Sequence, residues 1–294
     1  MARTKICSLL ALTLCLAGCG GLKPVVTVGS KNFTEQNLLG EIIAQHLQNR
    51  LHAPVARKLN LGGTMLAHSA LLNQEIDLYP EYTGTAFTNV LKHNGVTDPG
   101  VVFERVRAEY LEGMNLTWLD PLGFDNTFAL AVRGSDARER NLETLSDAAV
   151  DPKGFVLGAG YEFMERPDGF GSLNQTYNLR WIGGTKTMDL GLLYTALQTN
   201  KVSMIAGSAT DGPLSVLDIK VLKDDKQAFP PYQACIVVRT DKLKSNPQLR
   251  AALAELSGKF TTEKMRELNY RVDGKHEPMV QVAIDFLRSV GLAQ

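Results

Sequence analysis

The sequence predicts an α/β fold with two lobes that enclose a ligand cleft. One observation is the repeated alternation of short apolar strands with helices, both near the N-terminus and in the middle of the chain. The other is a pair of similar segments, "DNTFALAVRG" and "FPPYQACIVVRT", on either side of the middle block. Each has a polar start, an aromatic residue, an apolar run and an arginine, so we expect the chain to cross between the lobes twice. The 294 residues suffice for two lobes.

The first block runs strand, helix, strand, helix, strand. "VVTVGS" is a buried strand, and "TEQNLLGEIIAQHLQNRL" is a helix with Thr34 as its N-cap. "VARKLNLGG" is a strand, and "TMLAHSALLNQ" is a helix capped by Thr64. A third strand, Ile76–Leu78, ends where Pro80 interrupts "IDLYPEYTGTAF". The alternation indicates a parallel sheet. The apolar face of the first helix consists of Leu38, Leu39, Ile42, Ile43, Leu47 and Leu51.

The middle block repeats the alternation, and the tail is helical. "FALAVRG", "GFVLGAG" and "VSMIAGS" are strands, whereas "NLETLSDAAV" and "DLGLLYTALQTN" are helices. Helical periodicity then extends from Asn246 to Ala293. We expect lobe 1 at residues 25–122, lobe 2 at residues 123–232, and a return segment at residues 233–294 that mainly completes lobe 1.

The N-terminus has the pattern of an export signal. Arg3 and Lys5 precede an apolar run, Ile6–Leu16, which is too short to span a membrane as a helix. The run ends in "LAGC", which resembles a bacterial lipobox and implies cleavage before Cys19 and lipidation of its thiol. Residues 1–18 are then a signal peptide and residues 19–24 a lipidated tether. The expected location is extracytoplasmic, periplasm or cell surface, with a lipid anchor in a membrane.

Composition and motifs argue against several function classes. Lys+Arg and Asp+Glu both number 31, so no basic excess points to nucleic acid. After processing only Cys235 remains, within the apolar "YQACIVVR", where a free cysteine is usually a small hydrophobe. No metal-ligand spacing, Walker motif, G-x-S-x-G or complete dinucleotide loop is present. We therefore expect no metal, no cofactor and no enzymatic activity.

Polar and aromatic residues at expected strand ends and lobe crossings are the candidates for a binding site. Aromatic faces attract quaternary ammonium groups, and Lys and Arg suit a carboxylate, so the set fits a small zwitterion with a methylated cation. Structural roles stay open: core packing is an alternative role for the aromatic residues, and Glu162 and Arg166 have the spacing of a surface ion pair. The candidates are Lys31, Tyr82, Thr85, Asn126, Phe128, Glu162, Arg166, Asp211 and Tyr232.

Seven motifs spread over the chain resemble one family. "VGSKNFTEQ", "LGGT", "IDLYPEYTGTA", "DNTFALAVR", "RPDG", "DDKQAFPPY" and "RELNYRVD" are similar to the substrate-binding proteins of osmoprotectant ABC importers. These OpuAC- or ProX-like proteins bind glycine betaine, choline or carnitine. The resemblance implies a two-lobed type II periplasmic-binding-protein fold and an ABC permease as partner, to which the bound ligand is delivered.

The resemblance also assigns roles to individual residues. The family's cage tyrosines fall on Tyr82, Phe128 and Tyr232, and a fourth cage aromatic falls on Ser208. Its carboxylate-binding residues fall on Lys31 and Arg166, with a nearby threonine at Thr85. Tyr79 and Tyr194 match no cage position and are expected to be structural.

Two departures bear on the ligand. Phe128 keeps a ring face but loses a hydroxyl, and Ser208, after Gly207, removes a ring. A more open cage disfavours glycine betaine and favours a bulkier trimethylammonium compound, such as carnitine or ergothioneine. Retention of Lys31 and Arg166 argues against choline, which has no acid group. An exported small-metabolite enzyme and a sensor lipoprotein with the same fold remain as alternatives.

Overall fold

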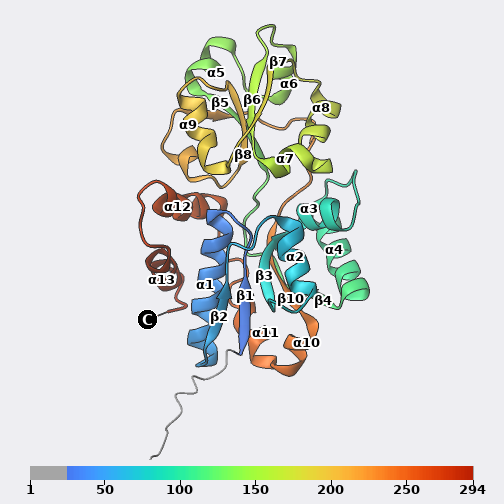
Figure 1. Cartoon of the computed structure of the whole chain (residues 1–294), viewed down its shortest axis with the longest axis vertical. Coiled ribbons are helices and arrows are strands. Elements are labelled where there is room, and N and C mark those ends of the chain that lie inside the picture. Colours follow the sequence, from blue (N-terminus) through green and yellow to red (C-terminus); the bar gives the residue numbers. More distant parts are fainter. Residues whose placement is uncertain (1–24, 294) are drawn as a thin grey trace, which may run out of the picture.

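The computed structural model describes residues 25–293, which form two lobes stacked along the long axis of the molecule (Figure 1). Each lobe contains a five-stranded sheet with helices packed around it. Within these residues no helix is long and apolar enough to cross a membrane. The predicted signal peptide, Cys19 and tether lie outside the described residues.

The sheet of the lower lobe in Figure 1 has the strand order β2-β1-β3-β10-β4. Its strands are β1 (Val26–Gly29), β2 (Val55–Lys58), β3 (Leu78–Tyr82), β4 (Leu116–Trp118) and β10 (Ala234–Arg239). The first three are parallel, as predicted, but β10 runs antiparallel to both β3 and β4. The expected parallel sheet is thus a mixed one, because β10 returns from the other lobe.

Helices before and after β10 cover this sheet. They are α1 (Thr34–Leu51), α2 (Thr64–Leu72), α3 (Thr83–Thr85), the π-helical η1 (Ala86–Val90), α4 (Pro99–Met114), α10 (Thr240–Ser245), α11 (Pro247–Ala254), α12 (Thr262–Asp273) and α13 (Met279–Ser289). The predicted apolar face of α1 is buried, except for the half-buried Leu51. The tail helices α11, α12 and α13 pack against α1, so the C-terminal segment completes the lower lobe.

The sheet of the upper lobe has the order β7-β6-β8-β5-β9. Its strands are β5 (Phe128–Arg133), β6 (Phe155–Ala159), β7 (Trp181–Thr187), β8 (Met204–Ser208) and β9 (Ile219–Val221). Its helices are α5 (Gly134–Arg140), α6 (Leu145–Val150), α7 (Tyr161–Glu165), η2 (Pro167–Gly171), α8 (Ser172–Tyr177), η3 (Leu190–Leu192), α9 (Leu193–Gln198) and η4 (Gly212–Ser215). This sheet is also mixed, since β5 is antiparallel to β8 and β9.

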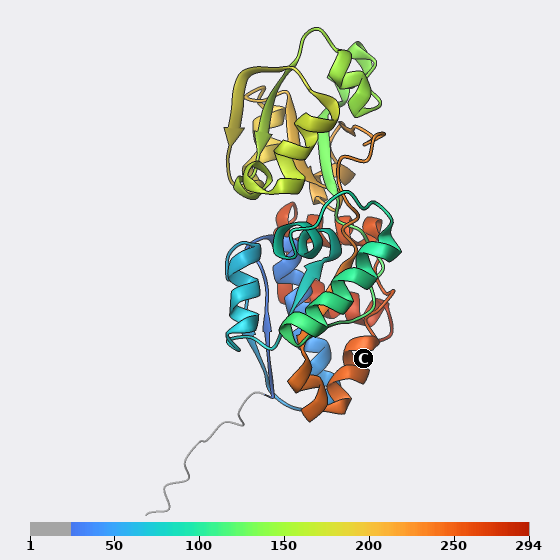
Figure 2. The same ribbon diagram turned by 90° about the vertical axis from the view of Figure 1, so that its right-hand side faces the viewer.

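Two antiparallel segments carry the chain between the lobes, as predicted. Asp125 pairs with Gln233 in an isolated bridge, and the Asn126 N–H donates to the Tyr232 carbonyl at 3.1 Å. Figure 2 shows these segments as the narrow connection between the lobes. Helix α12 supports the same place from the lower lobe, because Arg266 Nε donates to the Ala209 carbonyl at 2.6 Å. The residues before β5 and β10 therefore lie where the lobes meet.

The structure corrects three local predictions. Strand β3 does not end at Pro80 but continues to Tyr82. The Thr83 N–H donates to the Gln233 carbonyl just before β10, so by alternation Pro80 directs its nitrogen to the other side, where pairing with β1 has ended at Leu78. No ladder hydrogen bond is therefore lost at the proline.

The cap predictions for the first two helices are wrong. Phe33 and Gly63 are the N-cap residues, and neither helix start has a side-chain cap of its own. Thr34 instead donates through its hydroxyl to Asp273 Oδ1 at 2.6 Å. Sequence reasoning also missed α4, although Asp98 accepts from the Val101 N–H and Pro99 occupies the first helical position, which is a regular start signal.

Candidate ligand-binding site

Lys31 lies just after β1 with its charge completely enclosed. Its Nζ is 2.5 Å from Glu81 Oε1 and 3.3 Å from Thr64 Oγ1. The ammonium also lies 5.1 Å from the centre of the Tyr82 ring, a cation–π distance. Tyr79, for which the sequence predicts a structural role, donates a hydrogen bond from its hydroxyl to Glu81 Oε2 at 3.0 Å. It thus holds the carboxylate that neutralises Lys31.

A buried carboxylate, Glu35, connects the predicted residues Tyr82 and Asn126. The Tyr82 hydroxyl and Asn126 Nδ2 donate to Glu35 Oε1 at 2.6 and 2.8 Å, and Asn269 Nδ2 donates to Oε2 at 3.0 Å. Burial raises the pKa of Glu35, while the hydrogen bonds from Thr210, Tyr82 and Asn269 lower it in part. These contacts join α1, β3, a crossing segment and α12 at the lobe junction.

Phe128 and Tyr232 form an aromatic cluster at the ends of the two crossing segments. Their ring centres are 5.5 Å apart in an edge-to-face arrangement, which aromatic pairs prefer. The guanidinium carbon of Arg166 lies 5.2 Å from the Phe128 ring and 5.7 Å from the Tyr232 ring. Gly84 allows this packing, because a Cβ there would lie 2.6 Å from the Pro231 carbonyl and 2.8 Å from the Tyr232 ring.

Arg166 ends α7 and forms a two-bond ion pair with Asp168. Its Nε and Nη2 donate to the carboxylate at 2.9 and 2.5 Å. Asp168 Oδ2 also accepts from Thr88 Oγ1 at 2.7 Å, across the lobes, and from the Tyr232 hydroxyl at 2.6 Å. Burial alone would raise the pKa of Asp168, but Arg166 and the two hydroxyls hold it below its usual value. This ion pair therefore contacts both lobes.

Ser208 and Asp211 lie at the end of β8. Ser208 pairs directly with Phe128 across the sheet, so both side chains are on the same face. Asp211 Oδ2 accepts from the Ser208 N–H and from the Tyr194 hydroxyl, both at 2.8 Å. Burial raises the pKa of Asp211 to about 6. Tyr194, predicted to be structural, thus positions the predicted site residue Asp211.

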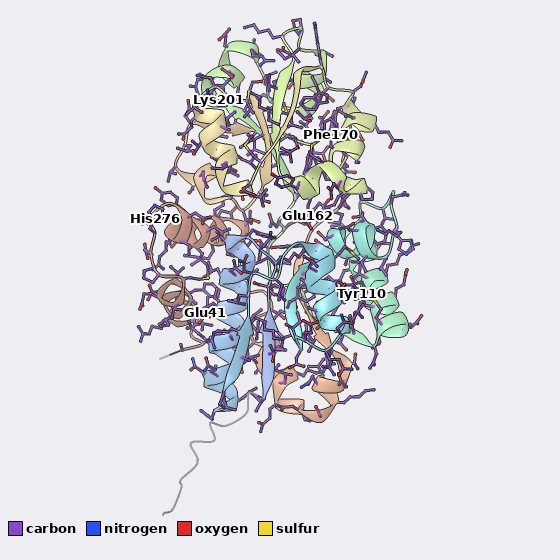
Figure 3. All side chains as sticks on the ribbon, viewed as in Figure 1. Glu41, Tyr110, Glu162, Phe170, Lys201 and His276 are labelled. Atoms are coloured by element: carbon purple, nitrogen blue, oxygen red, sulfur yellow. The ribbon has the colours of Figure 1, made fainter. Side chains whose placement is uncertain are left out.

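Glu162 and Thr85 complete the predicted set. Glu162, in α7 of the upper lobe, accepts from the Thr64 N–H of the lower lobe at 2.7 Å, and Figure 3 labels it between the lobes. Thr85 is buried in α3, one helical turn after Tyr82. The ten predicted residues therefore gather around the lobe junction, although they come from six separate segments. Their roles toward a ligand remain predictions.

The sequence did not indicate several carboxylates of this region. Glu81 and Asp168 fall inside the motifs "YPEYTGT" and "RPDG", but nothing in a sequence shows that a carboxylate will be buried beside a cation. The predicted carboxylate-binding residues Lys31 and Arg166 each have an internal carboxylate partner. An acidic ligand would therefore meet ion pairs rather than free cations.

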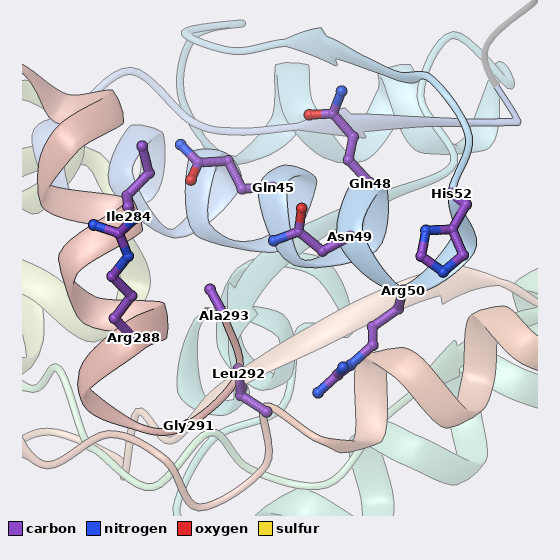
Figure 4. A pocket seen from close by; sticks show the side chains of 10 residues that line it. All are labelled: Gln45, Gln48, Asn49, Arg50, His52, Ile284, Arg288, Gly291, Leu292 and Ala293. Atoms are coloured by element: carbon purple, nitrogen blue, oxygen red, sulfur yellow. The ribbon is translucent and has the colours of Figure 1, made fainter.

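The described residues form a hollow beside the lobe junction and a groove away from it. One of about 440 Å³ borders the junction, with Thr88 of the lower lobe and Asp168 of the upper lobe in its wall. The other is a groove of about 860 Å³ between the C-terminal end of α1 and α13 (Figure 4). Gln45, Asn49 and Arg288 line that groove, and none of the ten predicted residues does. None of the ten lines the first hollow either, which adjoins the candidate site only through Thr88 and Asp168.

The fold is that of known two-lobed binding proteins. A crystal structure titled glycine betaine/carnitine/choline ABC transporter matches with a TM-score of 0.79 and 32% identity, over 91% of this chain and 99% of that chain. The structure of apo YehZ from Escherichia coli matches with a TM-score of 0.70 and 29% identity, over 92% of this chain and 99% of that chain. Together with the lobe-junction residues, these matches place the chain in the class of ABC-importer substrate-binding proteins.

The family follows from the sequence match. Residues 24–289 match OpuAC, the substrate binding domain of ABC-type glycine betaine transport system, and the chain belongs to this family. The carnitine transport binding protein OpuCC of Listeria monocytogenes is 34% identical over 96% of this chain and 92% of its own length. The glycine-betaine-binding protein of Pseudomonas aeruginosa is 35% identical over 94% of this chain and 93% of its own length.

A Helicobacter pylori relative differs in length. The ergothioneine transport permease/ergothioneine binding protein EgtU is 40% identical over 92% of this chain. The chain spans only 48% of that relative's length.

Proposed function

We propose that this protein is a lipid-anchored extracytoplasmic substrate-binding protein that delivers a betaine-type zwitterion to an ABC permease. The observation that carries the proposal is the convergence of Tyr82, Phe128, Tyr232, Lys31 and Arg166 at the lobe junction. The ring faces suit a trimethylammonium group, and the cations suit a carboxylate at the ligand's other end.

Protein cations near the rings support this assignment. Lys31 lies over Tyr82, and Arg166 lies over both Phe128 and Tyr232. Rings that attract the protein's own cations provide the field that a quaternary ammonium needs, because a trimethylammonium cannot donate hydrogen bonds. A ligand with both charges can add its cation to the rings and its carboxylate to Lys31 and Arg166.

The names of the relatives support the same ligand class. They name carnitine, glycine betaine and ergothioneine as transported or bound compounds. Each relative is at least 34% identical to this chain. This similarity supports betaine-type compounds as the ligand class but does not select one of the three compounds. Ser208 in place of a fourth ring favours a ligand bulkier than glycine betaine. The combined permease and binding protein of Helicobacter pylori supports a permease as the partner.

Isothermal titration with glycine betaine, carnitine, ergothioneine and choline tests the ligand class. We expect at least one of the three zwitterions to bind, and choline to bind at least about tenfold more weakly, since it lacks the acid group. Tyr82→Ala and Tyr232→Ala should each weaken binding of that zwitterion. Equal affinity for choline, or no binding of any compound, contradicts the assignment.

Membrane anchoring has a separate test. Cys19→Ser should release soluble protein or leave an unprocessed precursor, whereas the unmodified protein should fractionate with membranes. If both forms appear as soluble, processed protein, the lipid anchor is wrong.

A further inference from the structure

The carboxylate of Glu162 reaches from the upper lobe to the start of a helix in the lower lobe. Its Oε1 accepts from the Thr64 N–H at 2.7 Å, and its Oε2 lies 3.4 Å from Thr64 Oγ1. Thr64 is the first residue of α2, whose N-terminal N–H groups favour an anion. Among the described residues both hydrogen bonds of Glu162 go to Thr64, so they connect only the two lobes.

Two cations approach this contact, each of them already paired with a carboxylate. Lys31 Nζ is 3.3 Å from the same Thr64 hydroxyl that Glu162 approaches. Arg166 is close enough that the charge of Glu162 contributes to raising the pKa of its guanidinium. Glu162 therefore lies among the two cations that the proposed function assigns to the ligand's carboxylate.

The lower lobe leaves room for this carboxylate. The N-cap of α2 is Gly63, and no side chain caps the helix from within the lower lobe. A Cβ on Gly63 would collide with Glu162 Oε1. The backbone at Gly63, with φ −71° and ψ −176°, is open to any residue, so a side chain there would conflict only with the approach of Glu162.

We propose that Glu162 is an internal substitute for the ligand's carboxylate. It holds the lobes together when no ligand is bound, and an acidic ligand must displace it to reach Thr64 and Lys31. The competition between Glu162 and the ligand sets the affinity for zwitterions, and this part of the proposal rests on the proposed function. The other part, that Glu162 holds the unliganded lobes together, is independent of the proposed function.

Asp168 shows why Glu162 is suited to this exchange. Asp168 also bonds across the lobes, to Thr88, but it has a permanent partner in Arg166 of its own lobe. Glu162 is solvent-exposed, and its hydrogen bonds end in the opposite lobe. Releasing Glu162 therefore returns a carboxylate to water, whereas releasing Asp168 disturbs a buried ion pair.

Three variants test closure without any ligand. Glu162→Ala removes the carboxylate, Gly63→Ala displaces it without changing charge, and Glu165→Gln is a matched control on the same exposed helix. In the first two we expect a larger radius of gyration by small-angle X-ray scattering and faster hydrogen exchange at the Thr64 amide. The control should match the unmodified protein. Unchanged scattering and exchange in both variants overturn the proposal.

Ligand titration of the same variants tests the competition. Glycine betaine should bind about 2- to 10-fold more tightly to Glu162→Ala, the worth of one hydrogen bond that the ligand no longer has to replace. Gly63→Ala should not gain, because its Cβ occupies the place that the ligand's carboxylate would take. Choline, which has no carboxylate, should not gain in either variant. Weaker or unchanged binding of glycine betaine to Glu162→Ala overturns the competition, because Glu162 would then contact the ligand or stand apart from it. If no betaine binds any form, the proposed function fails, while scattering and exchange still decide closure.

Discussion

The two lobes contribute one buried cation each to the junction, and the two are held differently. Lys31 and Glu81 are almost wholly inaccessible, with side chains 3% and 0% exposed, and both belong to the lower lobe. Arg166 and Asp168 are 9% and 3% exposed and belong to the upper lobe, but Asp168 bonds to Thr88 of the lower lobe. Both ion pairs are formed within one lobe, but only the second also accepts a hydrogen bond from the opposite lobe.

This difference separates folding from closure. The bonds around Lys31 are present whatever the relative position of the lobes, so we expect them to contribute to stability. The bond from Thr88 to Asp168 depends on that position, so we expect it, and the Arg166 pair that holds Asp168, to contribute to ligand capture by hinge motion. Mutations around Lys31 should therefore change mainly the free energy of unfolding, whereas mutations around Asp168 should change mainly the ligand affinity.

Removing the partner of Lys31 should have the largest effect. Glu81→Gln leaves a buried ammonium without its counter-charge, which costs about 3–5 kcal/mol in the free energy of unfolding. Urea denaturation at pH 7 without ligand measures it. Adding Lys31→Met should recover most of the loss, and Glu109→Gln, whose exposed acid pairs with His93, should change little. A loss below about 1 kcal/mol would mean that the lower pair is not fixed as described.

Removing the cation of the upper pair should act mainly on binding. Arg166→Ala should weaken acid-bearing ligands by about 2–5 kcal/mol, the cost of truncating one partner of a buried charged contact. Arg140→Ala is the matched control, because Arg140 also bonds a buried aspartate, Asp151, and lies 4.2 Å over a ring, Phe155. The control should lose stability but keep its affinity by isothermal titration. Equal affinity losses in both variants would remove Arg166 from the site.

Asp211 offers a third contrast, since this buried carboxylate of the upper lobe bonds to a hydroxyl and an amide rather than to a cation. Burial raises its pKa from 3.8 to about 6, so the folded chain binds the proton more tightly than the unfolded chain. Stability is then highest below the unfolded pKa and falls as pH rises through about 6.

Asp211→Asn should remove this dependence while its side-chain oxygen still accepts both bonds. Lowering the pH from 7 to 5 should stabilise the unmodified protein by about 1 kcal/mol more than the variant. Urea denaturation at both pH values measures the difference. Parallel pH profiles would show that Asp211 does not titrate in this range.

Several helices and strands, and the paired crossing between the lobes, could be predicted from the sequence. Periodicity located α1, β6 and β8, and the similar segments around Phe128 and Tyr232 predicted the paired crossing. Resemblance to the family then identified positions at the junction that periodicity cannot distinguish from core residues.

Other features depend on neighbours distant in the sequence. Pro80 remains in a strand because β1 ends beside it, which no local rule contains. Lys31 and Glu81 are 50 positions apart, so their pairing becomes visible only in the fold. The same holds for Glu162, whose i,i+4 spacing to Arg166 indicates a surface pair, while its hydrogen bonds go to Thr64, 98 positions away.

The last prediction concerns the fourth cage ring, whose place the family resemblance assigns to Ser208. Ser208 faces the same side of the sheet as Phe128, directly opposite it, so Ser208→Tyr would place a second ring beside Phe128. A cation–π contact contributes about 0.5–2 kcal/mol, so glycine betaine should gain about 2- to 30-fold in affinity by isothermal titration.

A bulkier betaine should lose affinity in the same variant, because the new ring fills space that this ligand needs. Opposite signs for the two ligands are decisive, since a variant that only stabilised the closed form would improve both. Ala at position 208 is the control, and it should leave both affinities near those of the unmodified protein. If Ser208→Tyr changes neither affinity while Tyr82→Ala abolishes both, position 208 lies outside the cage. The missing ring would then not explain the ligand preference, and the openness of the upper-lobe side would have to come from the size of Phe128 alone.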